Sequence, residues 1–279
     1  MINQFLRNTL KTSVALAVLA VIVSALGLAT ATAGYNQGFE FTDRADFENN
    51  LIYSLNPNQN WFIQNNSDSP DINFDWNITG TSMVAINGFN AQAGSPGSCV
   101  WANYSSSAAS SSSTVISNWF LTPTLQFGAG DTVSFWTRTA GANSASPNTP
   151  SQYPDRLEVR LSTNGSSTNV GSLANSVGDF VTPLGDINPS YAQTTLTSTG
   201  SDGYPITWTQ YTYNIPVSNF QGRIGFRYFI QDTSIRGNLV GLDSFNTTAN
   251  LVPEPSSFVL MGLGLAGLAY RRHKARKSA

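Results

Sequence analysis

Apolar and polar side chains alternate along several stretches of the chain, most clearly at residues 131–139. Val133 and Phe135 share one face of an extended strand there. Ser134 and Trp136 fall on the opposite face. Because a strand turns successive side chains to opposite faces, this period of two predicts a strand with one buried face.

A second alternation lies at residues 156–163, where charged residues are interleaved with Leu157, Val159 and Leu161. Antiparallel sheets commonly place one face on the core and the other in water, so we expect these charged side chains to be exposed. An apolar period of 3.6 residues never extends beyond about ten residues. It is clearest at residues 45–55, where we expect a short helix. The expected strands are residues 37–41, 61–64, 82–86, 119–122, 131–139, 156–163, 208–215, 222–231 and 239–246.

Nine strands without helices between them predict an all-β fold, a jelly-roll-like antiparallel β-sandwich. Gly-, Asn- and Asp-containing turn signals separate the strands. Residues 105–113 are rich in serine and residues 141–154 lack any apolar period, so both should form surface loops. We find no internal repeat, and one domain over residues 34–250 is the simplest partition.

The N-terminal 33 residues have the pattern of a secretory signal peptide. Arg7 and Lys11 precede an apolar run over residues 14–28, and small residues follow at Ala31 and Ala33. A basic segment, an apolar segment of about 15 residues and an A-x-A site predict cleavage after Ala33 by signal peptidase. The alternative is an uncleaved membrane anchor, for which the run is short.

The C-terminal residues 251–279 contain a second targeting pattern. Pro253, Glu254 and Pro255 precede an apolar segment at residues 258–270, and Arg271 and Arg272 open a basic tail. A helix over this segment would be short for a typical bilayer core of about 30 Å, yet its basic flank could reach the lipid surface. The basic tail would stay in the cytoplasm and leave residues 34–250 outside.

This order of parts resembles the PEP-CTERM sorting signal of Gram-negative bacteria. The resemblance rests on the Pro253-Glu254-Pro255 motif, the apolar helix and the tail that begins with Arg271-Arg272. It implies transient insertion in the inner membrane, cleavage near the motif by an exosortase-like enzyme, and transfer to the cell surface or extracellular matrix. The alternative is a permanent anchor with a single span.

The charge of the chain is unevenly distributed. Hydrophobic residues make up 41% and charged residues 11% of the sequence, and its net charge is −2. Residues 34–250 contain seven arginines, fifteen acidic residues, no lysine and no histidine, which gives a net charge of −8. Such a body should not bind nucleic acid or an anionic membrane by electrostatic attraction.

The residue types also restrict catalysis. The one histidine, His273, follows the C-terminal apolar segment, so neither a Cys–His pair nor a Ser-His-Asp triad can form in the body. Cys99 is the one cysteine, which excludes an internal disulfide, and we expect it to be a buried small side chain. Paired carboxylates of a glycosidase are harder to exclude, so an envelope hydrolase stays a less favoured alternative.

A second resemblance covers nearly the whole body, to the choice-of-anchor J module. That module is similar to cleaved-adhesin domains, which are jelly rolls that bind calcium. The resemblance therefore implies a fold, while no biochemical activity follows from it. The blocks that carry it are residues 38–40, 117–123, 134–138, 154–162, 222–228 and 240–243.

The acidic residues suggest a structural calcium ion. Calcium binds six to eight oxygen atoms, and exported proteins meet it at high concentration. By resemblance to calcium-binding jelly rolls, the first and last strands lie close together and share an ion. Glu40 and Asp243 fall on those strands, with Asp43 and Asp46 as helpers. The alternative is that all four are solvated carboxylates at the rim.

Aromatic side chains are the usual platforms for sugar rings. Trp136 shares a face with Thr132 and Ser134, so among the six tryptophans we expect it to be the most exposed and a glycan contact. The sequence as a whole predicts an exported, non-enzymatic surface or exopolysaccharide-matrix protein with an adhesion role. The principal alternative is a lectin-like carbohydrate-binding module.

Overall fold

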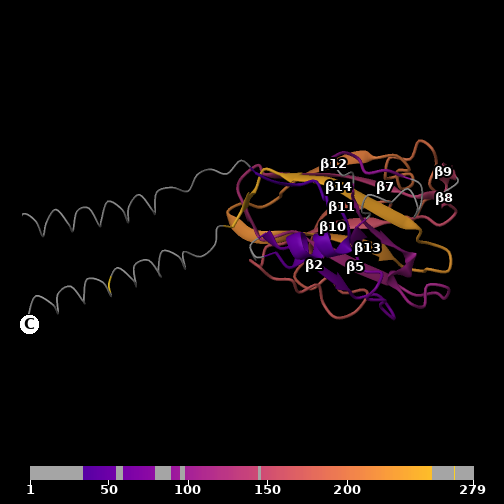
Figure 1. Ribbon diagram of the computed structural model, residues 1–279, viewed down its shortest axis with the longest axis horizontal. Coiled ribbons are helices and arrows are strands. Elements are labelled where there is room, and N and C mark those ends of the chain that lie inside the picture. Colours follow the sequence, from indigo (N-terminus) through magenta and orange to yellow (C-terminus); the bar gives the residue numbers. More distant parts are fainter. Residues whose placement is uncertain are drawn as a thin grey trace, which may run out of the picture. The chain divides into compact units, whose positions relative to one another are not determined.

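The computed structural model describes residues 34–54, 59–78, 89–94, 98–143 and 146–252, together with Gly267. The described residues form two large antiparallel sheets that lie one over the other, with β7, β12 and β14 in one layer and β5, β10 and β13 in the other (Figure 1), and a separate two-stranded sheet. The chain passes repeatedly from one sheet to the other, as it does in jelly rolls. The predicted all-β sandwich is confirmed.

The first sheet has six strands, in the order β12-β7-β14-β4-β3, and β1 also pairs with β14. Its centre is β14, which pairs with both β7 and β4. These strands are β1 (Tyr35–Gln37), β3 (Asn77–Ile78), β4 (Val100–Asn103), β7 (Thr132–Thr139), β12 (Thr209–Asn214) and β14 (Leu239–Thr247).

The second sheet has seven strands, in the order β11-β10-β13-β5-β2, with β6 joining β13 to β15. All of its pairs are antiparallel. These strands are β2 (Phe62–Asn65), β5 (Ile116–Leu121), β6 (Leu125–Phe127), β10 (Leu157–Ser162), β11 (Thr182–Ile187), β13 (Phe220–Ile230) and β15 (Asn250–Leu251).

The core between the sheets is rich in aromatic rings. Phe120 of β5 stacks on Trp61 with ring centroids 4.4 Å apart and on Trp76 at 5.5 Å. Phe226 of β13 meets Phe135 of β7 edge to face at 4.9 Å, which joins the two layers. All five side chains are buried, as the alternation of apolar residues requires. The expected faces of β7 are confirmed.

The charged face of β10 differs from the expectation. Glu158 is 3% exposed rather than solvated. It accepts hydrogen bonds from Arg156 (2.9 Å), Arg160 (2.7 Å) and Arg227 of β13 (3.0 Å). The reason is that the chain after β10 covers this face: Phe180 packs on Trp119 of β5, and Ala174 accepts a hydrogen bond from Arg227.

The expected helix at residues 45–55 is present as a short helix at residues 44–52, and residue 55 lies outside the described part of the chain. It is the α-helix α2 (Arg44–Phe47), continued by the π-helix η1 (Glu48–Ile52). Asp43 caps its start by accepting a hydrogen bond from the backbone of Asp46 at 2.9 Å. A short 3-10 helix η4 (Tyr104–Ser106) opens the serine-rich loop.

Two expected elements need correction, and strands that were not expected are present, namely β3, β4, β6, β11 and β15. The first strand ends at Gln37, because Phe39 adopts a positive φ of 56° and turns the chain into the core. The expected loop at residues 141–154 contains a hairpin of β8 (Gly141–Asn143) and β9 (Ser146–Pro150). Strand β11 was not expected, because Pro183 and Gly185 disfavour strands; β11 lies at a sheet edge, where proline is tolerated. The expected strand at residues 82–86 lies outside the described residues.

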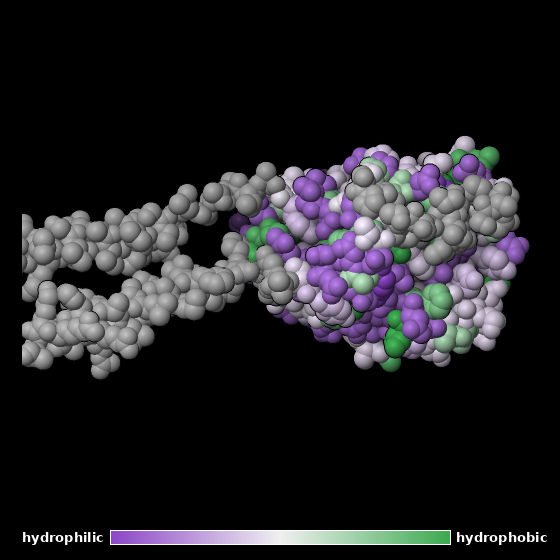
Figure 2. Space-filling model, in the orientation of Figure 1, coloured by the Kyte–Doolittle hydropathy of each residue, from purple (hydrophilic) through white to green (hydrophobic). Residues whose placement is uncertain are grey.

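Hydrophilic residues dominate the face shown in Figure 2, and hydrophobic residues form small separate patches on it. Among the described residues, no helix has the length and apolar character needed to cross a membrane. The expected C-terminal apolar helix falls outside those residues except for Gly267.

Candidate functional site

The sorting residues of the sequence lie outside the described part of the chain. These are Ala33 at the expected signal cleavage site, the Pro253-Glu254-Pro255 motif, and Arg271 and Arg272. Strand β15 and Val252 are the last consecutive described residues before the motif.

Glu40 and Asp243 are 203 positions apart in the sequence, yet the Glu40 charge acts on Asp243 in the fold. Asp243 lies on the central strand of the first sheet, between the part of β14 that pairs with β4 and the part that pairs with β1. Asp243 is on β14 and is fully buried, whereas Glu40 lies on the turn after Phe39 rather than on a strand. The backbone of Ser98 donates to Glu40 Oε2 at 3.2 Å. Gly94 has a φ of +91°, and a Cβ there would overlap the Glu40 carboxylate.

The Asp243 carboxylate anchors the segment at residues 89–94. Gln92 donates its backbone N–H to Oδ2 at 2.7 Å, and Ser244 donates to Oδ1 at 2.6 Å. Burial raises the pKa of Asp243 to about 7, with backbone donors opposing the shift and the Glu40 charge adding to it. Within the described ranges no arginine forms an ion pair with Asp243.

A buried carboxylate beside a second carboxylate is a place that favours a cation. The part of the chain that the structure describes contains no cluster of three or more His, Cys, Asp and Glu residues suited to a metal. A calcium ion held by Glu40 and Asp243 would therefore need carbonyl or water oxygens for its other ligands. The donor types fit calcium, which prefers oxygen.

Asp43 and Asp46, the expected helpers, have other partners in the structure. Asp43 is the N-cap of α2. Asp46 accepts hydrogen bonds from the backbone of Thr42 and from Asn50, which hold its pKa below the usual range. Their carboxylates thus stabilise the start of the helix, and of the other three residues only Glu40 acts on the charge of Asp243.

Trp136 is half-buried on β7. In the sheet it stands directly opposite Gln210 of β12 and Asp243 of β14. It is thus partly accessible, next to the candidate cation site. Its role as a glycan contact stays a prediction.

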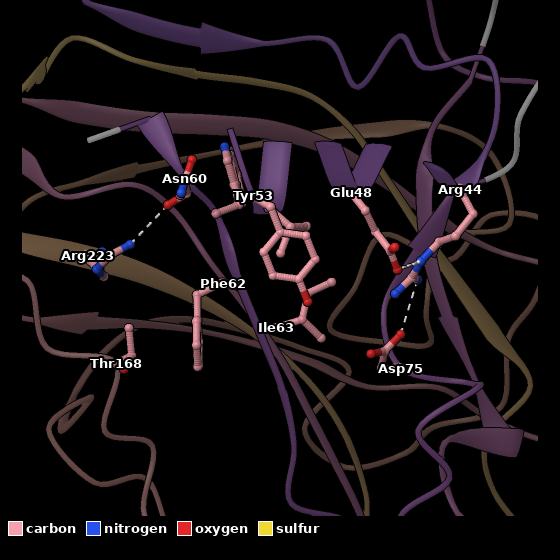
Figure 3. A pocket seen from close by; sticks show the side chains of 11 residues that line it. Arg44, Glu48, Tyr53, Asn60, Phe62, Ile63, Asp75, Thr168 and Arg223 are labelled. Atoms are coloured by element: carbon pink, nitrogen blue, oxygen red, sulfur yellow. Dashed lines mark hydrogen bonds and ion pairs between the residues drawn. The ribbon is translucent and has the colours of Figure 1, made fainter. Parts of the chain in front are cut away.

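A pocket of about 320 Å³ lies elsewhere, between the α2–η1 helix and the edge strand β2 (Figure 3). Tyr53, 71% exposed, lies in its middle. On one side is an ion-pair group, in which Arg44 contacts Glu48 at 2.6 Å and Asp75 at 3.1 Å. On the other side Arg223 of β13 donates to the backbone oxygen of Asn60 at 3.3 Å.

Sequence reasoning missed this pocket. Its lining residues come from five segments: the helix and Tyr53 after it, β2 with the two residues before it, Asp75 before β3, the loop after β10 and strand β13. No local motif joins them, because the folding of the sandwich alone brings them together. An exposed aromatic residue at the end of a short amphipathic helix was the one local signal available, and Tyr53 is that residue.

The comparisons with known proteins agree with the sequence at its C-terminus. Residues 251–274 match the model of the PEP-CTERM protein-sorting motif. The chain thus carries a PEP-CTERM sorting signal, which implies export, surface sorting and processing by exosortase-type machinery. A search of curated proteins finds no match.

Several solved structures are similar in fold. A cleaved adhesin domain of Lys-gingipain from Porphyromonas gingivalis is 17% identical, with a TM-score of 0.45, over 78% of this chain and 99% of that chain. The xylan-binding domain CBM22-1 of Paenibacillus barcinonensis Xyn10C is 10% identical, with a TM-score of 0.35, over 80% and 99%. A family 11 carbohydrate-binding module from Clostridium thermocellum is 10% identical, with a TM-score of 0.32, over 69% and 91%.

Proposed function

We propose that this chain is a non-enzymatic protein of the bacterial cell surface or exopolysaccharide matrix. A signal peptidase would remove residues 1–33, and an exosortase-like enzyme would cut near Pro253-Glu254-Pro255 after transient insertion in the inner membrane. The observation that carries the proposal is the PEP-CTERM match at residues 251–274. The mature product would be the β-sandwich.

The composition of the sandwich supports an exterior location. Its sequence has no lysine between residues 34 and 250 and carries a net charge of −8. A net charge far from zero keeps a protein soluble and limits self-association. Its polar surface, rich in Ser, Thr and Asn, also suits contact with a hydrated polymer.

The non-enzymatic part of the proposal rests on residue types. The sandwich sequence has no histidine or lysine to serve as a general base or nucleophile. The buried carboxylates have structural partners: Glu158 holds three arginines, and Asp155 accepts hydrogen bonds from Tyr228 at 2.7 Å and the backbone of Asn238 at 2.7 Å. An envelope hydrolase is therefore the less supported alternative.

A structural calcium ion at Glu40 and Asp243 is part of this proposal. Calcium would neutralise two adjacent carboxylates and fix the segment at residues 89–94 on the first sheet. The single supporting observation is the full burial of Asp243, whose pKa is raised to about 7, next to Glu40. A lectin-like module is the second candidate function, and the pocket beside Tyr53 favours it.

Fractionation of a host with a matching exosortase tests the proposal. We expect the wild-type chain in the surface or matrix fraction, and a variant with Pro253→Ala and Glu254→Ala in the membrane fraction. A Val217→Ala variant, altered at a side chain of the sandwich that is 45% exposed, is the matched control and should sort as the wild type does. Equal distribution of all three chains would refute exosortase sorting.

A further inference from the structure

The pocket around Tyr53 has buried oxygen atoms that can accept further hydrogen bonds. Asn60 Oδ1 is buried and accepts no hydrogen bond from any described residue. Asp75 Oδ1 is also buried, and its one charged partner is Arg44 Nη1 at 3.1 Å, which also donates to the backbone oxygen of Trp76 at 2.8 Å. Of the four buried side-chain atoms without a partner in the described residues, these two line one pocket.

Unpartnered buried acceptors are costly, at roughly 1–3 kcal/mol each, unless water or a ligand supplies the donor. The ligand that satisfies them must therefore carry N–H or O–H groups. Burial raises the pKa of Asp75 even though Arg44 lies beside it. A second negative charge on this side of the pocket would therefore be unfavourable. Hydroxyl groups meet the requirement without adding charge.

The opposite side of the pocket offers a donor. Arg223 is 8% exposed, and it donates Nε and Nη1 to backbone oxygens of Ser166, Asn60 and Thr122. No described residue accepts a hydrogen bond from its Nη2, and none forms an ion pair with it. A ligand hydroxyl can accept from Arg223 as readily as it donates to Asn60.

An apolar surface lies between these polar groups. The Tyr53 ring stands between the Asn60–Arg223 side and the Arg44–Glu48–Asp75 side, with Phe62 of β2 below it (Figure 3). A sugar ring has one apolar face and hydroxyl groups around its edge, so its face can lie on an exposed aromatic ring while its hydroxyls reach polar groups on both sides.

We propose that this pocket binds a short stretch of a neutral polysaccharide, with a sugar ring on Tyr53 and hydroxyls hydrogen-bonded to Asn60, Asp75 and Arg223. The two arginines and two carboxylates that line the pocket sum to no net charge, which favours a neutral over an acidic sugar. The site differs from that expected at Trp136. The inference rests on the proposed matrix role, since the matrix is where the chain meets polysaccharide.

Affinity gel electrophoresis of the full chain, purified in a non-denaturing detergent, tests the inference. The probes are dextran, galactan, xylan and mixed-linkage β-glucan as neutral polysaccharides, and alginate as the acidic one. We expect at least one neutral probe to retard the chain. Tyr53→Ala should weaken that binding about tenfold, because the ring stacking is lost, and Asn60→Ala should also weaken it.

Tyr104→Ala is the matched control, since Tyr104 is 46% exposed and lies outside the pocket lining. It should bind as the wild type does. The inference is overturned if no neutral probe retards the chain, if alginate alone does, or if Tyr53→Ala and Asn60→Ala leave binding unchanged. The electrophoresis measures binding whether or not the chain has been processed. A chain that binds no polysaccharide would therefore not contradict exosortase sorting. A chain that is not sorted could likewise still bind polysaccharide.

Discussion

Arg227 on β13 stands directly opposite Glu158 on β10 and donates a hydrogen bond to it at 3.0 Å. Both side chains are buried, at 2% and 3% exposure. The guanidinium carbon of Arg227 also lies 3.8 Å from the centre of the Phe229 ring. Arg227 and Glu158 therefore form an ion pair between neighbouring strands, and aromatic rings shield it from water. This pairing explains why a charged face of a strand can be buried.

We expect Glu158→Gln to destabilise the fold by about 3 kcal/mol at pH 7, because the change leaves three arginines with too little negative charge. Burial acts to raise the pKa of Glu158, but the hydrogen bond from Arg160 and the charge of Arg227 hold it below its usual value. A lowered pKa in the folded state stabilises the fold above the unfolded pKa of about 4.3 and loses this contribution as pH falls through the folded pKa.

Urea unfolding of both chains between pH 3 and pH 7 measures this effect. The difference in unfolding free energy between wild type and Glu158→Gln should shrink below about pH 4. Glu48→Gln is the control, since its carboxylate forms a more exposed ion pair with Arg44 and should change stability by under about 1 kcal/mol. A constant difference across the pH range would contradict the ionic role of Glu158.

Calcium should stabilise the protein through Glu40 and Asp243. Because extracellular calcium sites bind with constants of about 0.1–1 mM, 10 mM calcium should raise the Tm by about 4–8 °C. Asp243→Asn and Glu40→Gln should each abolish that rise. Thermal unfolding with calcium or with a chelator provides the measurement.

Asp46→Asn tests whether Asp46 helps to bind calcium or only stabilises the start of α2. Its carboxylate accepts hydrogen bonds from Thr42 and Asn50 there. This variant should have a lower Tm than the wild type and the same calcium response. If the wild type has the same Tm with calcium as with a chelator, the calcium proposal is wrong.

Cys99 should be inert in the folded protein. It is 1% exposed and packs in a cluster with Phe89, Trp101 and Leu239. Its reaction with Ellman's reagent requires local opening, so we expect labelling on the order of a hundredfold slower than for free glutathione. In guanidinium chloride one thiol per chain should react at once. Rapid labelling of the folded chain would show that the cluster is open.

The burial of side chains is predicted best where the alternation of apolar and polar residues within a single strand determines it. In β7, Val133 and Phe135 are buried and Trp136 half-buried, as their alternation indicates. The order of the strands in each sheet was not predicted, because it depends on pairing between distant segments. Prediction fails where a distant segment decides the environment, as at Glu158, which becomes buried because residues after β10 fold over it.

The candidate sites, too, were predicted only in part from the sequence. Glu40 and Asp243 could be paired in advance because a jelly roll brings its first and last parts together, although Glu40 lies on a turn. The assignment of Asp43 as a ligand could not anticipate that its carboxylate caps α2. The Tyr53 pocket depends on five separate segments, and no sequence pattern reveals such an arrangement.

The central claim is that the chain is exported, processed at both ends and released as a sandwich. Its most direct test is the intact mass of the protein recovered from a host with the matching exosortase. We expect a chain that begins at Gly34 and ends near Pro253-Glu254-Pro255, carrying any group added at the cut. A membrane-bound chain that retains Arg271, Arg272 and the residues after them would contradict the account.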